Sequence, residues 1–153
     1  SVDLTFSRPF TFNYAEFSHI KRPTDIVRLS LDETYQGDRV LAFIVGLRRM
    51  LMASYDNNTE FFYLTNIDQQ KLYNSARNIE IAAWLLAKSR DKDGNLLMLS
   101  DSLADERRNL SYQRLIGRMI ATQDNLAEII SQKTGRIIKT VVVRAATVVF
   151  LPI

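Results

Sequence analysis

The chain has 153 residues, of which 46% are hydrophobic and 24% charged, and this size and composition favour a single domain over residues 1–153. They exclude a disordered chain and a coiled-coil rod. The absence of cysteine excludes disulfides, thiolate metal sites and a cysteine nucleophile, while the net charge of +3 permits contact with nucleic acid or anionic lipid without indicating either.

Residues 2–31 alternate apolar and polar positions with a period of two, and several of the apolar positions are aromatic. This pattern predicts extended strands. Pro9 and Pro23 interrupt the alternation, so we expect short or edge strands.

A helical pattern begins after Asp38, a plausible N-cap, and predicts a first long helix over about 39–55. Its other faces are also apolar, as expected of a central helix buried on more than one side. The main apolar stripe comprises Val40, Ile44, Leu47 and Leu51. A face of small residues, where another helix could approach closely, comprises Ala42, Gly46 and Ala53.

The second helix is expected over about 67–89, with Thr65 or Asn66 as its N-cap. A second face of this helix carries the residue types enriched in binding hot spots. Contact with a partner and burial under the N-terminal strands explain that face equally well. The core stripe comprises Leu72, Ala76, Ile79, Ala83 and Leu86, and the second face comprises Tyr73, Arg77, Glu80 and Trp84.

A third helix is expected over about 101–133, with Gly135 as its C-terminal cap. The segment 137–151 matches both a helical stripe and a β-branched strand, and its β-branched density after Gly135 favours the strand. The third helix's buried arc comprises Tyr112, Ile116, Met119, Gln123, Leu126 and Ile130.

Together these elements predict an α+β fold that is mainly α. Three principal helices (about 39–55, 67–89 and 101–133) are flanked by extended segments at 2–31 and 137–151. Either the two apolar ends pair into a small sheet against the helices, or they extend to a neighbouring subunit and add strands there.

No catalytic or metal-binding constellation is apparent, and we expect no cofactor and no metal. The lone histidine, His19, has no assignable catalytic partner. Asp91 and Gly94 lie in a stretch that resembles part of a calcium loop, but the first ligand is weak and the final glutamate is missing, so an Asp-Gly turn is the preferred interpretation. Carboxylates at Asp32/Glu33, Asp105/Glu106 and Asp124/Glu128 are expected at the surface.

Residues 139–152 resemble the entry to the first membrane helix of CorA-type ion transporters. The Gly-Met-Asn motif of that family is absent, and Arg144 would be costly inside a bilayer. Membrane contact is therefore expected only near this end, if anywhere.

The leading functional hypothesis is a non-enzymatic assembly or scaffold component that contacts copies of itself or a larger complex. The contact residues it predicts are Phe6, Phe10, Phe12, Tyr14, Tyr73, Arg77, Trp84 and Phe150. The alternative is a nucleic-acid-associated protein that grips phosphates with Arg107, Arg114 and Arg118, although a solvated face balanced by Asp124 and Glu128 explains the same stripe.

A third hypothesis is a small enzyme with a carboxylate-based site at Glu33 or Glu80, and the sequence favours a non-enzyme over it. The localisation is left open. The first residues lack the basic and then apolar pattern of a secretory signal, which slightly favours the cytoplasm over a mature secreted or periplasmic chain.

Overall fold

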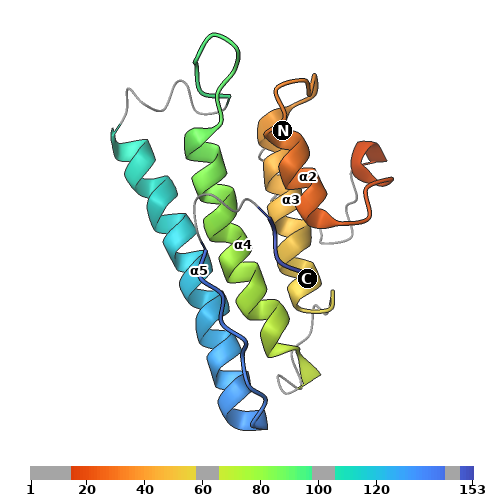
Figure 1. Cartoon of the computed structure of the whole chain (residues 1–153), viewed down its shortest axis with the longest axis vertical. Coiled ribbons are helices and arrows are strands. Elements are labelled where there is room, and N and C mark those ends of the chain that lie inside the picture. Colours follow the sequence, from red (N-terminus) through yellow and green to blue (C-terminus); the bar gives the residue numbers. More distant parts are fainter. Residues whose placement is uncertain (1–14, 58–65, 98–105, 144–148) are drawn as a thin grey trace.

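The computed structural model describes residues 15–57, 66–97, 106–143 and 149–153, and for residues 106–112 it describes the backbone alone. A 3-10 turn, η1 (Ala15–Phe17), precedes four α-helices (Figure 1). They are α2 (Pro23–Ser30), α3 (Arg39–Ser54), α4 (Gln69–Lys88) and α5 (Glu106–Thr134).

The predicted α+β class is wrong for these ranges, because they contain helices and a single isolated antiparallel bridge but no strand or sheet. The bridge joins Arg90 to Leu96 across the turn after α4. In that turn the carboxylate of Asp91 accepts hydrogen bonds from the backbone N–H groups of Asp93 and Asn95, and Gly94 has a φ of +80°. The preferred Asp-Gly turn is therefore confirmed.

The prediction of extended structure over 2–31 is wrong for its second half, while residues 2–14 lie outside the described ranges. Pro23 occupies the first turn of α2 instead of interrupting a strand, because its fixed φ suits a helix start and its missing N–H would be unpaired there anyway. The buried residues Ile26, Val27 and Ser30 then follow a helical spacing. The period of two over residues 2–31 as a whole concealed this short helical pattern.

Helix α3 begins where the sequence predicts, with the carboxylate of Asp38 accepting a hydrogen bond from the N–H of Leu41 at 3.0 Å. Its small-residue face is where α2 packs. A Cβ atom on Gly46 would lie 2.7 Å from Cγ2 of Val27 and 2.8 Å from its backbone nitrogen, so the two helices approach as closely as glycine allows.

The main stripe predicted for α3 is only partly the buried one. Val40 is 44% exposed, whereas Phe43, Val45 and Met50 from the other faces are buried. The helix is covered on more than one side, as expected, because α2 packs along one side of it and α4 touches another. A single stripe is a poor guide for such a helix.

Helices α4 and α5 lie side by side over much of their length (Figure 1). Asp68 is the N-cap of α4, because its carboxylate accepts a hydrogen bond from the N–H of Gln70 at 2.8 Å, so neither Thr65 nor Asn66 has that role. Helix α5 ends at Thr134, and Gly135 caps it as predicted, with a φ of +71° and its N–H donating to the carbonyl of Ser131. The predicted stripes of both helices hold the core residues Leu72, Ala76, Ile79, Ile116 and Ile130, all buried.

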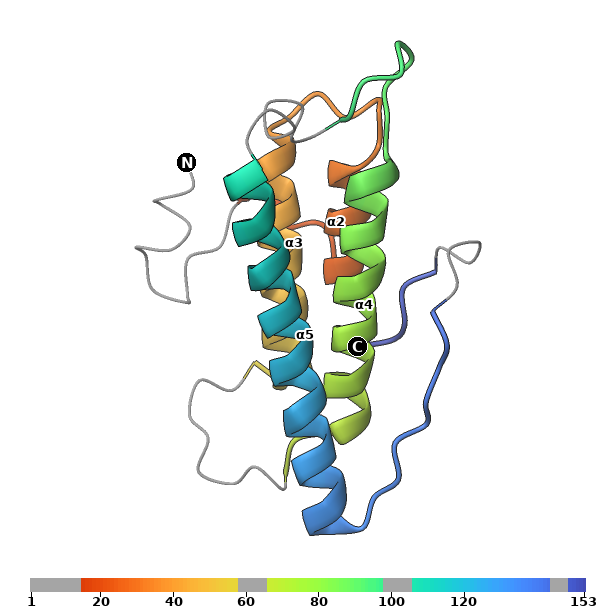
Figure 2. The same cartoon turned by 90° about the vertical axis from the view of Figure 1, so that its left-hand side faces the viewer.

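The strand favoured for 137–151 is also wrong for residues 137–143 and 149–151, as is the helical alternative, while residues 144–148 lie outside the described ranges. Within 136–143 and 149–153 the chain has neither helical nor strand hydrogen bonding. It runs from the end of α5 back along α4, and the C-terminus lies beside the middle of α4 (Figure 2). The β-branched residues favour an extended backbone. Within the described ranges, however, that backbone forms its hydrogen bonds with side chains of a helix instead of with another strand.

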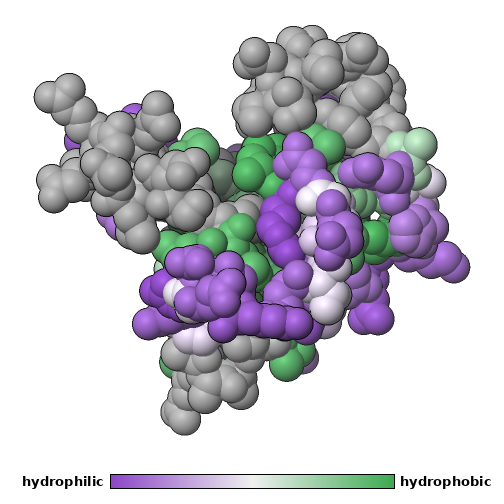
Figure 3. All heavy atoms as spheres, turned by 90° about the horizontal axis from the view of Figure 1, so that it is seen from above, coloured by the Kyte–Doolittle hydropathy of each residue, from purple (hydrophilic) through white to green (hydrophobic). Residues whose placement is uncertain are grey.

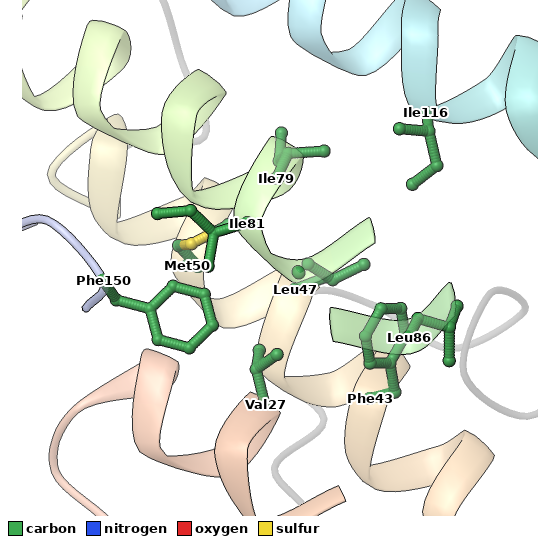
Figure 4. Close-up of a cluster of buried hydrophobic side chains, with 10 residues drawn as sticks. Val27, Phe43, Leu47, Met50, Ile79, Ile81, Leu86, Ile116 and Phe150 are labelled. Atoms are coloured by element: carbon green, nitrogen blue, oxygen red, sulfur yellow. The ribbon is translucent and has the colours of Figure 1, made fainter. Parts of the chain in front are cut away.

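The main core fills the space between α2, α3, α4 and α5, and the C-terminal segment contributes to it. Phe150 is 9% exposed and points into the group formed by Val27, Met50 and Ile81 (Figure 4). Seen from above, the described surface at one end of the bundle is largely hydrophilic, with apolar side chains visible between the polar groups (Figure 3). No helix within the described ranges has both the length and the apolar character needed to cross a membrane.

A candidate backbone-binding face on α4

One face of α4 carries polar side chains that hold the C-terminal segment by its backbone. We call Gln70, Tyr73, Asn74 and Asn78 the polar ladder. Their spacing of three, one and four residues places them on neighbouring positions of the helix surface. Asn78 is fully buried, and Tyr73 and Asn74 are 8% and 9% exposed, so the segment covers most of the ladder.

We call each side chain of the ladder a rung. Two of the rungs bind the backbone of residues 139 and 141. Nε2 of Gln70 donates to the carbonyl of Lys139 at 3.0 Å, and Oε1 accepts from the N–H of Lys139 at 2.8 Å. The hydroxyl of Tyr73 donates to the carbonyl of Val141 at 3.1 Å and accepts from its N–H at 2.9 Å. Each side chain thus satisfies both polar groups of one residue, as a neighbouring strand would.

The other two rungs bind the backbone of Leu151 and Pro152. Nδ2 of Asn78 donates to the carbonyl of Leu151 at 2.9 Å, while Oδ1 accepts from its N–H at 2.7 Å. Nδ2 of Asn74 donates to the carbonyl of Pro152 at 2.9 Å and Oδ1 accepts from Gln70 at 3.0 Å. The segment therefore runs along α4 in the direction of the helix at 139–141 and in the opposite direction at 151–152.

The alternation of these contacts shows which backbone groups remain available. In an extended chain the N–H and C=O of one residue point to the same side, and those of the next residue point to the other side. Residues 139 and 141 point to α4. The backbone groups of residues 138, 140 and 142 make no hydrogen bond within the described residues, so the segment has one paired and one unpaired edge.

Arg77 lies next to the ladder and links α4 to α5. Its guanidinium pairs with Asp124 at 2.5 Å and Glu80 at 3.2 Å, and it stacks on the ring of Tyr73 at 4.8 Å. Burial alone would lower the pKa of Arg77, but the hydrogen bond that Arg77 donates to Asp124 and the charge of Glu80 raise it overall. Burial also raises the pKa of Glu80, against the opposite effect of Arg77.

A buried polar centre around Gln123 joins α3, α4 and α5. Gln123 is 2% exposed, and its Nε2 donates to the hydroxyls of Ser54 at 3.0 Å and Ser75 at 2.7 Å. Its Oε1 accepts from the hydroxyl of Tyr55, whose pKa is raised by burial. Every polar atom of the Gln123 amide is paired, which is what its burial requires.

The residues predicted for partner contact have different surroundings. Tyr73 and Phe150 are buried within the chain itself, Arg77 pairs with two carboxylates, and Trp84 is half-buried on α4. The predicted residues of the N-terminal arm, Phe6, Phe10, Phe12 and Tyr14, lie outside the described ranges.

The arginine stripe of α5 is described only in part, since the side chain of Arg107 lies outside the described ranges. Arg114 and Arg118 are exposed and form no ion pair within the described residues. Asp124, which was expected to balance them, pairs with Arg77 instead.

The residues considered for catalysis and metal binding are not brought together. His19 and Glu33 are exposed, and Glu80 lies in the ion pair with Arg77. Among the described residues, no group of three or more histidine, aspartate or glutamate side chains could hold a metal ion.

The polar ladder was missed by sequence reasoning. A stripe of glutamine, tyrosine and asparagine on an amphipathic helix normally faces water, and nothing in the pattern shows that backbone covers it. One available signal was that Ile81 and Leu85 lie outside the core stripe, which gave α4 more apolar surface than two-layer packing needs. Comparison with models of known families, with curated proteins and with solved structures gives no match to this chain.

Proposed function

We propose that the protein is a non-enzymatic assembly component that contacts a second copy of itself through its C-terminal segment. One observation carries this proposal: α4 holds the backbone of the C-terminal segment in place, yet several apolar side chains of the segment are exposed. Ile137 is 84% exposed, Val142 78% and Val149 66%. Apolar side chains gathered on one exposed segment are typical of a contact surface.

The unpaired edge of the segment supports the same proposal. The N–H and C=O groups of residues 138, 140 and 142 have no partner within the described residues, and an extended chain with such an edge is a template for an added strand. Two copies can add to each other there in antiparallel fashion, because a two-fold axis makes the same edge complementary to itself. The β-branched residues of 140–143 suit a paired strand.

A substitution at Thr140 tests this contact. Proline at 140 removes an N–H from the unpaired edge while leaving the groups of residues 139 and 141 that bind the ladder. We expect the wild-type chain to form dimers as its concentration rises in light scattering. The Thr140→Pro variant should remain monomeric at concentrations at least about tenfold higher, with little change in stability.

Val142→Asp should have the same effect, because it places a charge in the apolar contact. Val40→Asp, at an exposed valine in the first turn of α3, is the matched control and should leave the association unchanged. A wild-type chain that stays monomeric over the whole concentration range would contradict the proposed function.

A second candidate function rests on Arg114 and Arg118, which are exposed on one stripe of α5 without an acidic partner within the described residues. Two such arginines can bind phosphates of a nucleic acid. Fluorescence anisotropy with labelled oligonucleotides at low salt should then show binding that weakens as salt increases, and that the double variant Arg114→Gln with Arg118→Gln reduces. Absence of binding at low salt would eliminate this candidate.

A further inference from the structure

We propose that the polar ladder of α4 is a receptor for an extended polypeptide backbone, and that in an assembly it holds the C-terminal segment of a second copy. This inference rests on the proposed function insofar as copies associate. It adds a second contact between copies, on the face of the segment opposite to the unpaired edge.

The ladder binds main-chain atoms. All the hydrogen bonds described between the ladder and the segment end on the N–H or C=O of residues 139, 141, 151 and 152. Main-chain groups are common to all residue types, so this part of the site selects an extended conformation and not a sequence.

Selectivity comes from the residue that precedes Leu151. Phe150 fills the space between Val27, Met50 and Ile81 (Figure 4), and the guanidinium of Arg28 lies 5.3 Å from the centre of its ring. A suitable occupant therefore needs an aromatic side chain in register with the rungs. This chain's own C-terminal segment meets that requirement, which is why we infer that the occupant is a second copy.

The segment can be exchanged without altering a helix. Within the described residues, the part of the chain after Arg136 forms no backbone-to-backbone hydrogen bond with any other part. Its hydrogen bonds are formed with α4 side chains, and it packs on the bundle through Phe150, with Ile138, Val143 and Ile153 partly buried beside the core. If two copies exchange their segments, each ladder regains the same contacts, so the exchanged and unexchanged forms differ mainly in the cost of association.

The test uses two full-length variants that are defective in complementary ways. Gln70→Ala with Asn78→Ala impairs the ladder but keeps an intact segment. Val141→Pro with Phe150→Ala impairs the segment but keeps an intact ladder, because proline removes the N–H that Tyr73 accepts. Each variant alone should be unable to form the contact, whereas a mixture provides one intact ladder and one intact segment.

We expect the equimolar mixture to form a heterodimer in size-exclusion chromatography with light scattering. The amide of Leu151 in the ladder-defective chain should exchange at least about tenfold more slowly after mixing. A third chain that carries all four changes is the control: it offers no intact ladder, so it should leave the exchange of Leu151 in the ladder-defective variant unchanged. A mixture that stays monomeric, with unchanged exchange at Leu151, would overturn the inference.

Thr140→Pro separates this result from the proposed function. When it is added to both variants, it removes pairing at the unpaired edge but leaves the ladder contacts, so the heterodimer should persist if segments are exchanged. A heterodimer that disappears in this background indicates edge pairing alone and overturns the exchange. If a double variant loses its helical circular dichroism, the single variants Asn78→Ala and Val141→Pro carry the same test.

Discussion

Asn78 shows at the scale of one residue how the C-terminal segment is held. It is fully buried and binds both the N–H and the C=O of Leu151. Replacing it by alanine leaves two covered backbone groups without a partner, so we expect Asn78→Ala to lower the free energy of unfolding by about 1–3 kcal/mol. Urea denaturation measures this change.

Asn125→Ala is the matched control, because Asn125 is exposed on α5. It should change the free energy of unfolding by less than about 0.5 kcal/mol. Equal effects of the two substitutions would show that the Asn78 contacts do not stabilise the folded chain.

Gln123 has a comparable role in the centre of the bundle. A leucine at this position has a similar size but cannot pair with Tyr55, Ser54 or Ser75. We expect Gln123→Leu to cost about 1–3 kcal/mol, because the hydrogen bonds that Gln123 forms with Tyr55, Ser54 and Ser75 are lost in a buried place. In the Tyr55→Phe background the cost of Gln123→Leu should be smaller, and a double-mutant cycle that shows no coupling would contradict this account.

Glu80 should make stability depend on pH. Burial raises the pKa of its carboxyl, so above the ordinary pKa of glutamate the folded chain binds more protons than the unfolded chain. The protonated carboxyl of Glu80 therefore contributes to stability below the ordinary pKa of glutamate, and this contribution is lost as the pH rises through the raised pKa of the folded chain. The side chain is 37% exposed, so solvent limits the effect to a few tenths of a kcal/mol, roughly.

The variant Glu80→Gln keeps the shape of the neutral form and removes the titration. Its stability relative to the wild type should increase as the pH rises from about 4 through the raised pKa of Glu80. Urea denaturation of both chains at each pH measures the difference. A relative stability that falls over this range would mean that the ion pair with Arg77 outweighs the burial of the carboxylate.

At the scale of elements, the approach of α2 to α3 depends on Gly46. A Cβ there would lie 2.8 Å from the backbone nitrogen of Val27, which cannot move without shifting α2. We expect Gly46→Ala to destabilise the chain by about 1–3 kcal/mol. Gly117→Ala on α5 meets nothing within 4 Å and should stabilise by up to about 1 kcal/mol through helix propensity. Thermal unfolding distinguishes these opposite signs.

The three long helices could be predicted because each contains its own evidence. Asp38 and Gly135 mark a helix start and a helix end, and the core stripe of α4 repeats at helical spacing. Helix α2 could not be identified in this way, because it is short and its apolar residues also fit a period of two. Pro23 is compatible with either structure.

The ladder could not be predicted because its partner lies far away in the sequence. Gln70 and Lys139 are polar residues that each suit a solvent-exposed position, and only the path of the chain after Gly135 brings them together. The strand propensity of 140–143 was a real signal for extended structure. It could not show that the hydrogen-bonding partners are side chains of a helix.

At the scale of the whole molecule, the described part is a helical bundle with the last segment held on its surface by α4. The segment contributes Phe150 to the core and presents Ile137, Val142, Val149 and one backbone edge outward. The feature that unites these observations is the alternation between ladder-bound and unpaired backbone groups along 138–142. Any partner of the unpaired edge meets a segment that α4 already holds in place.

Amide hydrogen exchange of the C-terminal segment, measured by NMR at a concentration where the chain is monomeric, tests this alternation most directly. The amides of Lys139, Val141 and Leu151 should exchange at least about tenfold more slowly than those of Thr140 and Val142, because α4 accepts from the first group. Equal exchange rates along the segment, whether fast or slow, would contradict the account of a backbone held rung by rung on α4.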